Sequence, residues 1–216
     1  MKRAIKHQLG TTLVGLMVGM LVSVVGILAS LSLYKTLVSV ATEAKVDAIH
    51  DGQLATTLLA VQLRIQNAGF GLVGNAANIV IAANGNEKNV LWRYKVDGVT
   101  TCEGLRRSNR TVNSRPSIAL DYVRATGAGC NDVNALTTMT WTVETTLSIF
   151  PRNVTEVIDF SLAPQLCSPY GMDEAGNFYV LTLKGKTAAN IAGAQHQGSP
   201  LKDTEFKVCL PNVRSA

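Results

Sequence analysis

The sequence predicts an α+β fold, in which one long N-terminal helix packs on a mostly antiparallel β-sheet. Three observations support this prediction. Between Gly26 and Gly69 the chain has no proline and only one glycine, Gly52, so nothing breaks a helix there. Beyond Phe70, short runs of alternating apolar and polar residues are separated by turn residues, as in antiparallel strands. All four cysteines lie in this second part, which indicates disulfides in the C-terminal region.

The chain begins with a short basic head that includes Lys2, Arg3 and Lys6, and it then has no charged residue from Gln8 to Tyr34. An apolar run of more than about 18 residues predicts a membrane-spanning helix. The basic residues before it favour a cytoplasmic N-terminus. A cleavable secretory signal would have an apolar core of only about 7 to 15 residues, ending in an A-x-A-like site, and the run fits neither feature. A plain uncleaved anchor remains an alternative.

We expect the helix to continue beyond the membrane as an amphipathic helix that ends near Ala68. At about 1.5 Å per residue, such a helix is roughly 85 Å long, whereas a bilayer core needs only about 30 Å. The remainder should therefore bury an apolar stripe against a globular domain. The predicted stripe is Val46, Ile49, Leu54, Leu58, Val61 and Ile65, and the predicted polar side is Glu43, Lys45, Asp47, Asp51, Gln53, Gln62 and Gln66.

Both ends of this helix carry a family resemblance. The basic leader that ends in Gly10, followed by TTLVGLMVGMLVSVVGIL, resembles the class III signal of type IV prepilins and type II secretion pseudopilins. The resemblance implies that a prepilin peptidase cuts between Gly10 and Thr11 and methylates Thr11. The later stretch LLAVQLRIQNAGFGL resembles PilW-like minor pilins, in which an Arg and an Ala-Gly-aromatic segment end the helix. The matching residues here are Arg64, Ala68, Gly69 and Phe70.

One position departs from the family pattern. Most members have a glutamate at the fifth residue after the cut, where this chain has Gly15, and Thr11 replaces the usual Phe or Met. In the family that carboxylate pairs with the N-terminal amine of a neighbouring subunit, because a lone buried charge costs several kcal/mol. A subunit with Gly15 fits best where no preceding amine needs neutralising, which favours the filament tip or the start of assembly. The alternative is that Gly15 is a tolerated variation without positional meaning.

The resemblance implies a domain organisation and a set of partners. Residues 1–10 are the leader, 11–34 the transmembrane and filament-core half of the helix, and 35–216 a pilin-like periplasmic domain that includes the amphipathic half 35–68. The expected partners are other minor and major pilins, the prepilin peptidase, the inner-membrane assembly platform and, before assembly, the membrane itself. The expected location is the inner membrane, as a single-pass protein with a periplasmic C-terminus, and later the pilus at the cell surface.

The resemblance predicts a structural minor pilin of a type IV pilus, acting in assembly initiation or at the tip. A minor pseudopilin of a type II secretion system shares this architecture and is the first alternative. A periplasmic binding or enzymatic domain on an uncleaved anchor is the alternative from another class.

The C-terminal part contains about six clear strand candidates and one short one. They are 79–81, 90–96, 117–125, 138–150, 155–162, 177–185 and 203–210. In the run 138–150 the predicted inner face is Met139, Trp141, Val143, Leu147 and Ile149. The densest basic cluster, Arg106, Arg107 and Arg110, has no aromatic residues between its members and is interpreted as a solvated loop.

The four cysteines, Cys102, Cys130, Cys167 and Cys209, allow three disulfide pairings. We predict Cys102–Cys130 and Cys167–Cys209, because each pair closes one sequential loop. The second pair also resembles the C-terminal disulfide-bounded region of pilins. No C-x-x-C spacing occurs, which argues against a structural zinc site.

The sequence gives little support to catalysis, to cofactors or to nucleic-acid binding. Removal of the leader takes away three basic residues, so the 20 basic and 15 acidic residues become 17 and 15, a net charge of +2 without the basic stripe that nucleic acids need. His50 and His196 have no neighbouring motif that would make either a catalytic base, and both are interpreted as solvated. No cofactor is expected, although Asp173, Glu174 and Asn177 supply oxygen ligands for a possible calcium ion.

Overall fold

The computed structural model describes residues 13–74, 76–85, 87–125, 129–151, 157–169, 175–191, 195–196, 199–200 and 203–214. The predicted cut between Gly10 and Thr11 lies outside these residues, as do Asp173 and Glu174 of the calcium hypothesis. The chain divides into two compact units, Met1–Val46 (unit 1) and Asp47–Ala216 (unit 2). Each unit is described by itself.

Helix α1 spans Leu13–Ile65 without a break and contributes to both units. Within unit 1 it is exposed at every described position. It is the one helix among the described residues that is long and apolar enough to cross a membrane. The helix ends three residues before the predicted Ala68, and a turn follows it.

Within unit 2, α1 buries one stripe of side chains between two antiparallel sheets. Leu54, Leu58, Val61 and Ile65 are buried, as predicted, together with Thr57. The prediction was wrong for Val46 and Ile49, which are 61% and 53% exposed. Burial begins only at His50, so an apolar residue before that point has nothing to pack against.

The predicted single sheet is in fact two larger sheets and one short ribbon, all antiparallel. The five-stranded sheet follows chain order, with β1 Ile79–Asn84, β2 Glu87–Val96, β3 Val99–Val112, β4 Arg115–Ala125 and β5 Trp141–Pro151. The three-stranded sheet has the order β10-β7-β6, with β6 Ile158–Cys167, β7 Gly176–Gly185 and β10 Thr204–Arg214. The ribbon pairs β8 Gln195–His196 with β9 Ser199–Pro200, and the short helices are η1 Ala76–Asn78, η2 Leu136–Thr138 and α2 Ala188–Ile191.

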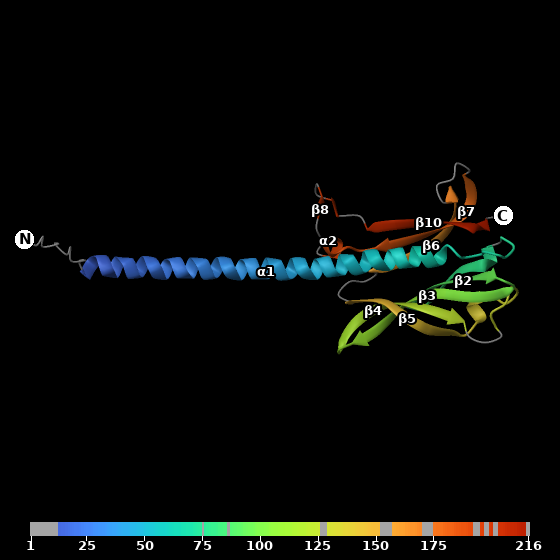
Figure 1. The fold of residues 1–216 in the computed structure, drawn as a ribbon, viewed down its shortest axis with the longest axis horizontal. Helices are drawn as coiled ribbons and strands as arrows, with labels where there is room; N and C mark the ends of the chain where they lie inside the picture. Colours follow the sequence, from blue (N-terminus) through green and yellow to red (C-terminus); the bar gives the residue numbers. More distant parts are fainter. Residues whose placement is uncertain are drawn as a thin grey trace, which may run out of the picture. The chain divides into compact units, whose positions relative to one another are not determined.

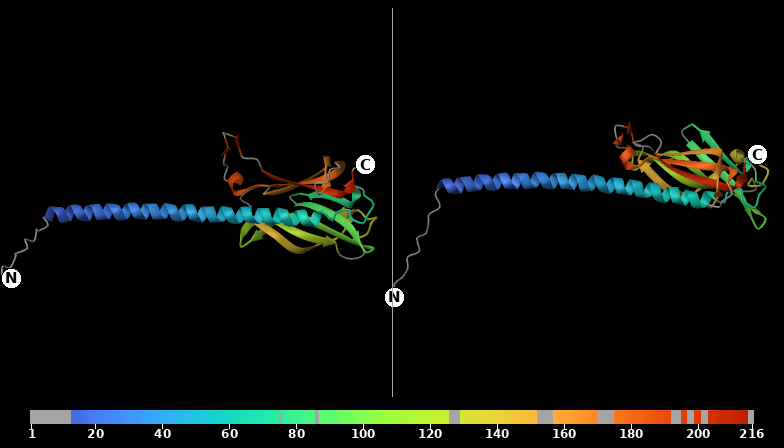
Figure 2. Two further views of the ribbon diagram at one scale, coloured as in Figure 1. Left: turned by 45° about the horizontal axis from the view of Figure 1, so that its top comes forward. Right: turned by 90° about the horizontal axis from the view of Figure 1, so that it is seen from above.

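In Figure 1 the three-stranded sheet lies above the unit 2 part of α1 and the five-stranded sheet lies below it. In the view turned by 90° the two sheets overlap, and most of both lies to one side of the helix (Figure 2, right). The main core combines the helix stripe with inward residues of both sheets, and its largest buried side chains include Trp92, Phe150 and Phe160. A smaller apolar cluster on the outer face of the five-stranded sheet contains Leu91, Val123 and Leu136. The predicted α+β class, with one long helix packed on antiparallel strands, is therefore confirmed.

The interpretation of Arg106, Arg107 and Arg110 as a solvated loop was wrong, because all three lie on β3, a strand that we did not predict. The Arg107 guanidinium donates to the Ile158 backbone carbonyl at 3.0 Å, and Arg110 forms an ion pair with the fully buried Asp121. These partners lie on two other strands, β6 and β4. They allow a charged segment to form a strand with neighbours on both sides.

The predicted inner face of β5 was partly wrong. Val143 and Ile149 are exposed, whereas Phe150 and Ser148 are buried. Trp141, Leu147 and Met139, the last of which lies before the strand, are partly buried. The pairing of β5 with β4 shifts register twice, between Leu120 and Asp121 and between Tyr122 and Val123. Each shift places an extra residue in β5, and this changes which side chains face inward.

Asp159 on β6 joins the two sheets. Its carboxylate lies 2.7 Å from the Lys88 ammonium on β2 and 3.5 Å from the Arg107 guanidinium on β3. Burial by itself would raise the pKa of Asp159, but the Lys88 hydrogen bond, a backbone hydrogen bond and the charges of Lys88 and Arg107 outweigh it and lower the pKa below 3.8. The pKa of Asp159 is lower in the folded protein than in the unfolded chain. The stabilisation of the folded state by the ionised Asp159 is therefore complete above about pH 4, and it is lost as the pH falls through the folded pKa.

The variant Asp159→Asn should therefore lose about 1 kcal/mol of stability at neutral pH, a modest value because the pair is partly exposed. The difference from the unchanged protein should persist from pH 7 to about pH 5 and shrink below about pH 4. Urea unfolding of the full chain in detergent, repeated across this pH range, measures it. Lys88→Met should remove much of the same pH-dependent component. A difference that stayed constant down to pH 2.5 would contradict the role given to Asp159.

Gly52 should be replaceable with a gain in stability. It lies inside α1, and a Cβ built on it meets nothing within 4 Å. Alanine is favoured over glycine in a helix interior by about 1 kcal/mol, so Gly52→Ala should raise the free energy of unfolding by about that amount. Gly104→Ala is the opposite control, because its Cβ would lie 2.6 Å from Leu91 Cδ2 and 2.9 Å from the Val90 carbonyl oxygen. Chemical unfolding of both variants should give shifts of opposite sign.

Candidate functional site

The first candidate site is the apolar surface of α1 from Leu13 to Tyr34. This stretch has no charged residue, and its large apolar side chains are all exposed within the chain. Soluble proteins rarely expose apolar patches of more than a few hundred Å². This surface therefore needs lipid or protein to cover it.

Three hydroxyl groups on and just beyond this surface are hydrogen-bonded inside the helix. Ser30, Thr36 and Thr42 each donate to the backbone carbonyl four residues earlier, at 2.9, 3.1 and 2.7 Å. Such back-bonding pairs a polar side chain without any partner outside the helix. The helix can therefore be surrounded by apolar groups without burying these hydroxyls unpaired.

Gly15, at the position where the prepilins that the leader resembles have a glutamate, lies near the start of α1. The first turn of α1 contains no acidic residue, and the first acidic residue of the whole chain is Glu43. This half of α1 therefore offers no carboxylate to a neighbouring amine. The structure places Gly15 inside this helix.

The residues that end the helix connect it to the five-stranded sheet. The Arg64 guanidinium carbon lies 3.9 Å from the centre of the Tyr122 ring. Burial, and then the neighbouring Glu103 carboxylate, raise the pKa of Tyr122, so the phenol stays neutral beneath the guanidinium. Ala68 is fully buried, and Phe70 is about half exposed.

The segment that follows runs along β2 and pairs with its backbone. The Gly69 N–H donates to the Arg93 carbonyl at 2.8 Å, and the Lys95 N–H donates to the Phe70 carbonyl at 2.7 Å. The Arg and Ala-Gly-aromatic residues singled out in the sequence thus form the junction between the helix and the sheet.

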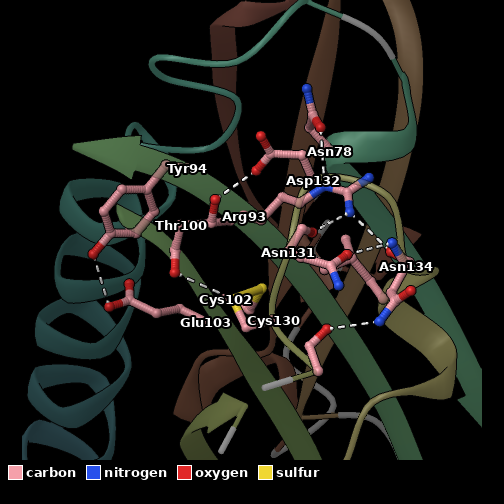
Figure 3. Close-up of a disulfide and its surroundings, with 12 residues drawn as sticks. Asn78, Arg93, Tyr94, Thr100, Cys102, Glu103, Cys130, Asn131, Asp132 and Asn134 are labelled. Atoms are coloured by element: carbon pink, nitrogen blue, oxygen red, sulfur yellow. Dashed lines mark hydrogen bonds between the residues drawn. A yellow bond between two sulfur atoms is a disulfide. The ribbon is translucent and has the colours of Figure 1, made fainter. Parts of the chain in front are cut away.

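Arg93 anchors the loop that contains Cys130. Its guanidinium is buried and donates to the backbone carbonyls of Asn131 and Asn134 at 2.8 Å each (Figure 3). It also donates to Asn78 Oδ1 at 3.1 Å and to the Ala77 carbonyl at 3.2 Å. Burial lowers the pKa of Arg93, and nearby Asp132 opposes that shift. Because several acceptors surround the guanidinium, this buried cation holds two loops together.

A disulfide and an ion pair secure the same loop. Cys102 on β3 bonds Cys130, with 5.8 Å between the Cα atoms. Lys95 Nζ lies 2.7 Å from Asp132 Oδ2, and the hydrogen bonds from Lys95 and then from Thr100 lower the pKa of Asp132. The second predicted disulfide is also present, between Cys167 on β6 and Cys209 on β10. Both predicted pairings are therefore confirmed.

The histidines do not form a site with the other candidate residues. His50 is not solvated as predicted, because its ring packs edge-on against Phe150 with 5.4 Å between centres, and its Nε2 lies 2.9 Å from the Lys186 carbonyl oxygen. His196 lies in β8, and its side chain is outside the described residues. Asn177 lies on β7, and the described part of the chain contains no group of three His, Cys, Asp or Glu residues that could hold a metal.

The sequence did not single out the buried charged residues Arg93, Glu103 and Asp121, because nothing in their local pattern distinguishes them from surface charges. In the structure Glu103 accepts hydrogen bonds from Tyr94 and Arg124, at 3.0 and 3.1 Å. Asp121 accepts one from Thr146 at 2.7 Å. Each of these charges is paired inside the fold, which indicates a structural contribution.

No protein-family model, no curated protein and no solved structure matches the chain. The described residues include one helix that could span a membrane, an α+β unit built on the end of that helix, and two disulfides.

Proposed function

We propose that this chain is a structural minor pilin of a type IV pilus, acting in assembly initiation or at the filament tip. The main support is the uninterrupted helix Leu13–Ile65. Its first part exposes a charge-free apolar surface, and its last part forms the core of an α+β unit. One helix thus combines an element that needs an apolar environment with the scaffold of a folded domain.

Assembly would use the apolar part of α1 in two environments in turn. Lipid tails are about as apolar as leucine, so exchanging lipid for neighbouring helices changes hydrophobic burial little. Because Ser30, Thr36 and Thr42 are hydrogen-bonded within the helix, the exchange leaves none of these hydroxyls unpaired. Packing between helices then supplies the specificity.

The absence of an acidic residue before Glu43 supports a place at the tip or at the start of the filament. A subunit in the body of the filament would need a carboxylate near Gly15 to pair with its neighbour's amine. In this proposal the partners are other pilins, the prepilin peptidase, the inner-membrane assembly platform and the membrane. A minor pseudopilin of a type II secretion system would use the same helix in the same way.

Intact mass spectrometry of the membrane-extracted full chain, with and without co-expressed prepilin peptidase, tests the proposal. We expect the peptidase to remove residues 1–10 and to leave Thr11 as the N-terminus, with the further mass of one methyl group. The control is Gly10→Leu, which should keep the full-length mass under the same conditions.

An unchanged mass for the natural chain, beside an authentic prepilin that is cut in the same cells, would contradict the proposal. The chain would then be a periplasmic domain on an uncleaved anchor. Cleavage would leave open the choice between pilus and secretion system, which co-purification with subunits of either assembly would decide.

A further inference from the structure

Unit 2 exposes several large apolar side chains at the end where α1 finishes. They come from the segment after α1, from the turn between β2 and β3, and from the loop after Cys130 (Figure 1). The residues are Phe70, Val73, Val96, Val99 and Val133, and they are between 46% and 89% exposed. We call this set the end patch. Beside Val133 lies a groove of ≈ 290 Å³ lined mainly by small apolar side chains, such as Ala76, Ala77 and Ala135.

The end patch is held in place by the contacts beneath it. The Phe70 carbonyl accepts from Lys95, and the Val73 carbonyl accepts from Asn78 Nδ2 at 2.8 Å. Val96 and Val99 are paired across the β2–β3 turn. Arg93 and the disulfide Cys102–Cys130 fix the loop that carries Val133. A preorganised apolar surface loses little entropy on binding, which favours a docking surface over a flexible loop region.

The charges around the end patch restrict the chemistry of its partner. Lys95 and Asp132 neutralise each other, and the Arg93 guanidinium is buried and donates four hydrogen bonds within the fold. The carboxylate of Asp97, exposed in the β2–β3 turn, forms no ion pair or side-chain hydrogen bond with any residue that the structure describes. The end patch therefore presents an apolar area with one unpaired negative charge, and its complement is an apolar surface with one basic side chain.

Two other occupants fit this pattern less well. A second copy docked patch to patch would bring two Asp97 carboxylates into one interface, where like charges repel. A bilayer surface with anionic lipids would repel Asp97, and the described residues of the end patch provide no free cation to bind the head groups.

We propose that the end patch docks a different membrane-anchored subunit, which presents an apolar surface and a basic side chain opposite Asp97. This inference rests on the proposed function, because it takes the partner to be another subunit of the same assembly. Five such side chains expose an area on the order of the few hundred Å² typical of a functional patch, which is below the roughly 800 Å² per partner of a stable soluble complex. A contact of this size suits a neighbour that is already held nearby by its own anchor.

Site-specific photo-crosslinking in the native cells tests the inference. The full chain would carry p-benzoylphenylalanine at Val99 or at Val133, and the control would carry it at Leu166, which is 72% exposed on β6. We expect Val99 and Val133 to give an adduct that Leu166 does not, and peptide sequencing should identify a second membrane-anchored chain with a basic residue at the contact. Asp97→Lys should lower the adduct yield about fivefold, the effect expected for a surface charge pair. In the Asp97→Lys background, replacing the contacting lysine or arginine of the partner with glutamate should restore the adduct yield.

The inference would be overturned if the adducts formed only with lipid or only with a second copy of the chain. It would also be overturned if the probe at Leu166 gave as much adduct as the other two positions, or if Asp97→Lys left the adduct yield unchanged. The mass of the leader in the same samples separates the two proposals. A processed chain without the adduct would refute the end patch as a docking surface while the pilin proposal stands. An unprocessed chain with the expected adduct would support the docking surface and refute the pilin proposal.

Discussion

Replacing Gly71 with alanine should lower the free energy of unfolding by about 3 kcal/mol. Gly71 has φ +69°, a left-handed conformation that side chains rarely adopt, and a Cβ there would lie 2.1 Å from the Lys95 carbonyl oxygen. The backbone cannot move aside easily, because the Lys95 N–H is already bonded to the Phe70 carbonyl. Urea unfolding of the full chain in detergent, followed by tryptophan fluorescence, measures the change.

Gly85→Ala is the matched control. Gly85 also has a positive φ, +57°, but a Cβ there meets nothing within 4 Å. The free energy of unfolding of this variant should therefore fall only by the cost of placing a Cβ on a left-handed backbone, about 1 kcal/mol. Equal losses in the two variants would show that the close approach of Gly71 to β2 is not what makes glycine necessary.

The variant Arg93→Leu should have an effect of similar size, about 3 kcal/mol. It removes the donor that satisfies the Asn131, Asn134 and Ala77 carbonyls and Asn78 Oδ1. We also expect residues 129–138 to lose protection from amide hydrogen exchange, because the buried guanidinium no longer holds their loop.

Arg106→Leu is the control for this change. Arg106 lies on β3, and its Nε is buried without a hydrogen-bond partner among the described residues. Replacing it should shift stability by less than about 1 kcal/mol, and removing an unpaired buried donor can even stabilise a protein. If Arg106→Leu were as damaging as Arg93→Leu, the hydrogen bonds of Arg93 could not explain its effect.

The sequence predicted the elements whose apolar residues follow a regular period. The helix stripe from Leu54 to Ile65 follows the helical period, and Val90 and Trp92, two residues apart on β2, face the same main core. β3 lacks such a pattern, because its arginines pair with carboxylates on other strands, Asp121 on β4 and Asp159 on β6. No periodicity within β3 itself can indicate a strand that depends on ion pairs with residues of other strands.

Some features of the candidate sites could likewise be predicted from the sequence, and others could not. The apolar run and the two disulfides were predictable from composition, spacing and resemblance. The location of the end patch was not, because Phe70, Val96 and Val133 belong to three separate segments and meet only in the folded chain. The exposure of Val46 and Ile49 was missed because a helical stripe does not say where the packing partner begins.

The bond between Cys167 and Cys209 has a mechanical consequence for any filament that contains this chain. The two residues are 42 apart in the sequence, and an extended chain spans at most about 3.4 Å per residue. When the molecule is pulled from its ends, the bond therefore prevents roughly 140 Å of chain between the two cysteines from being extended. Tension can bend or shear the three-stranded sheet, but it cannot unravel β7, which lies inside that covalent loop.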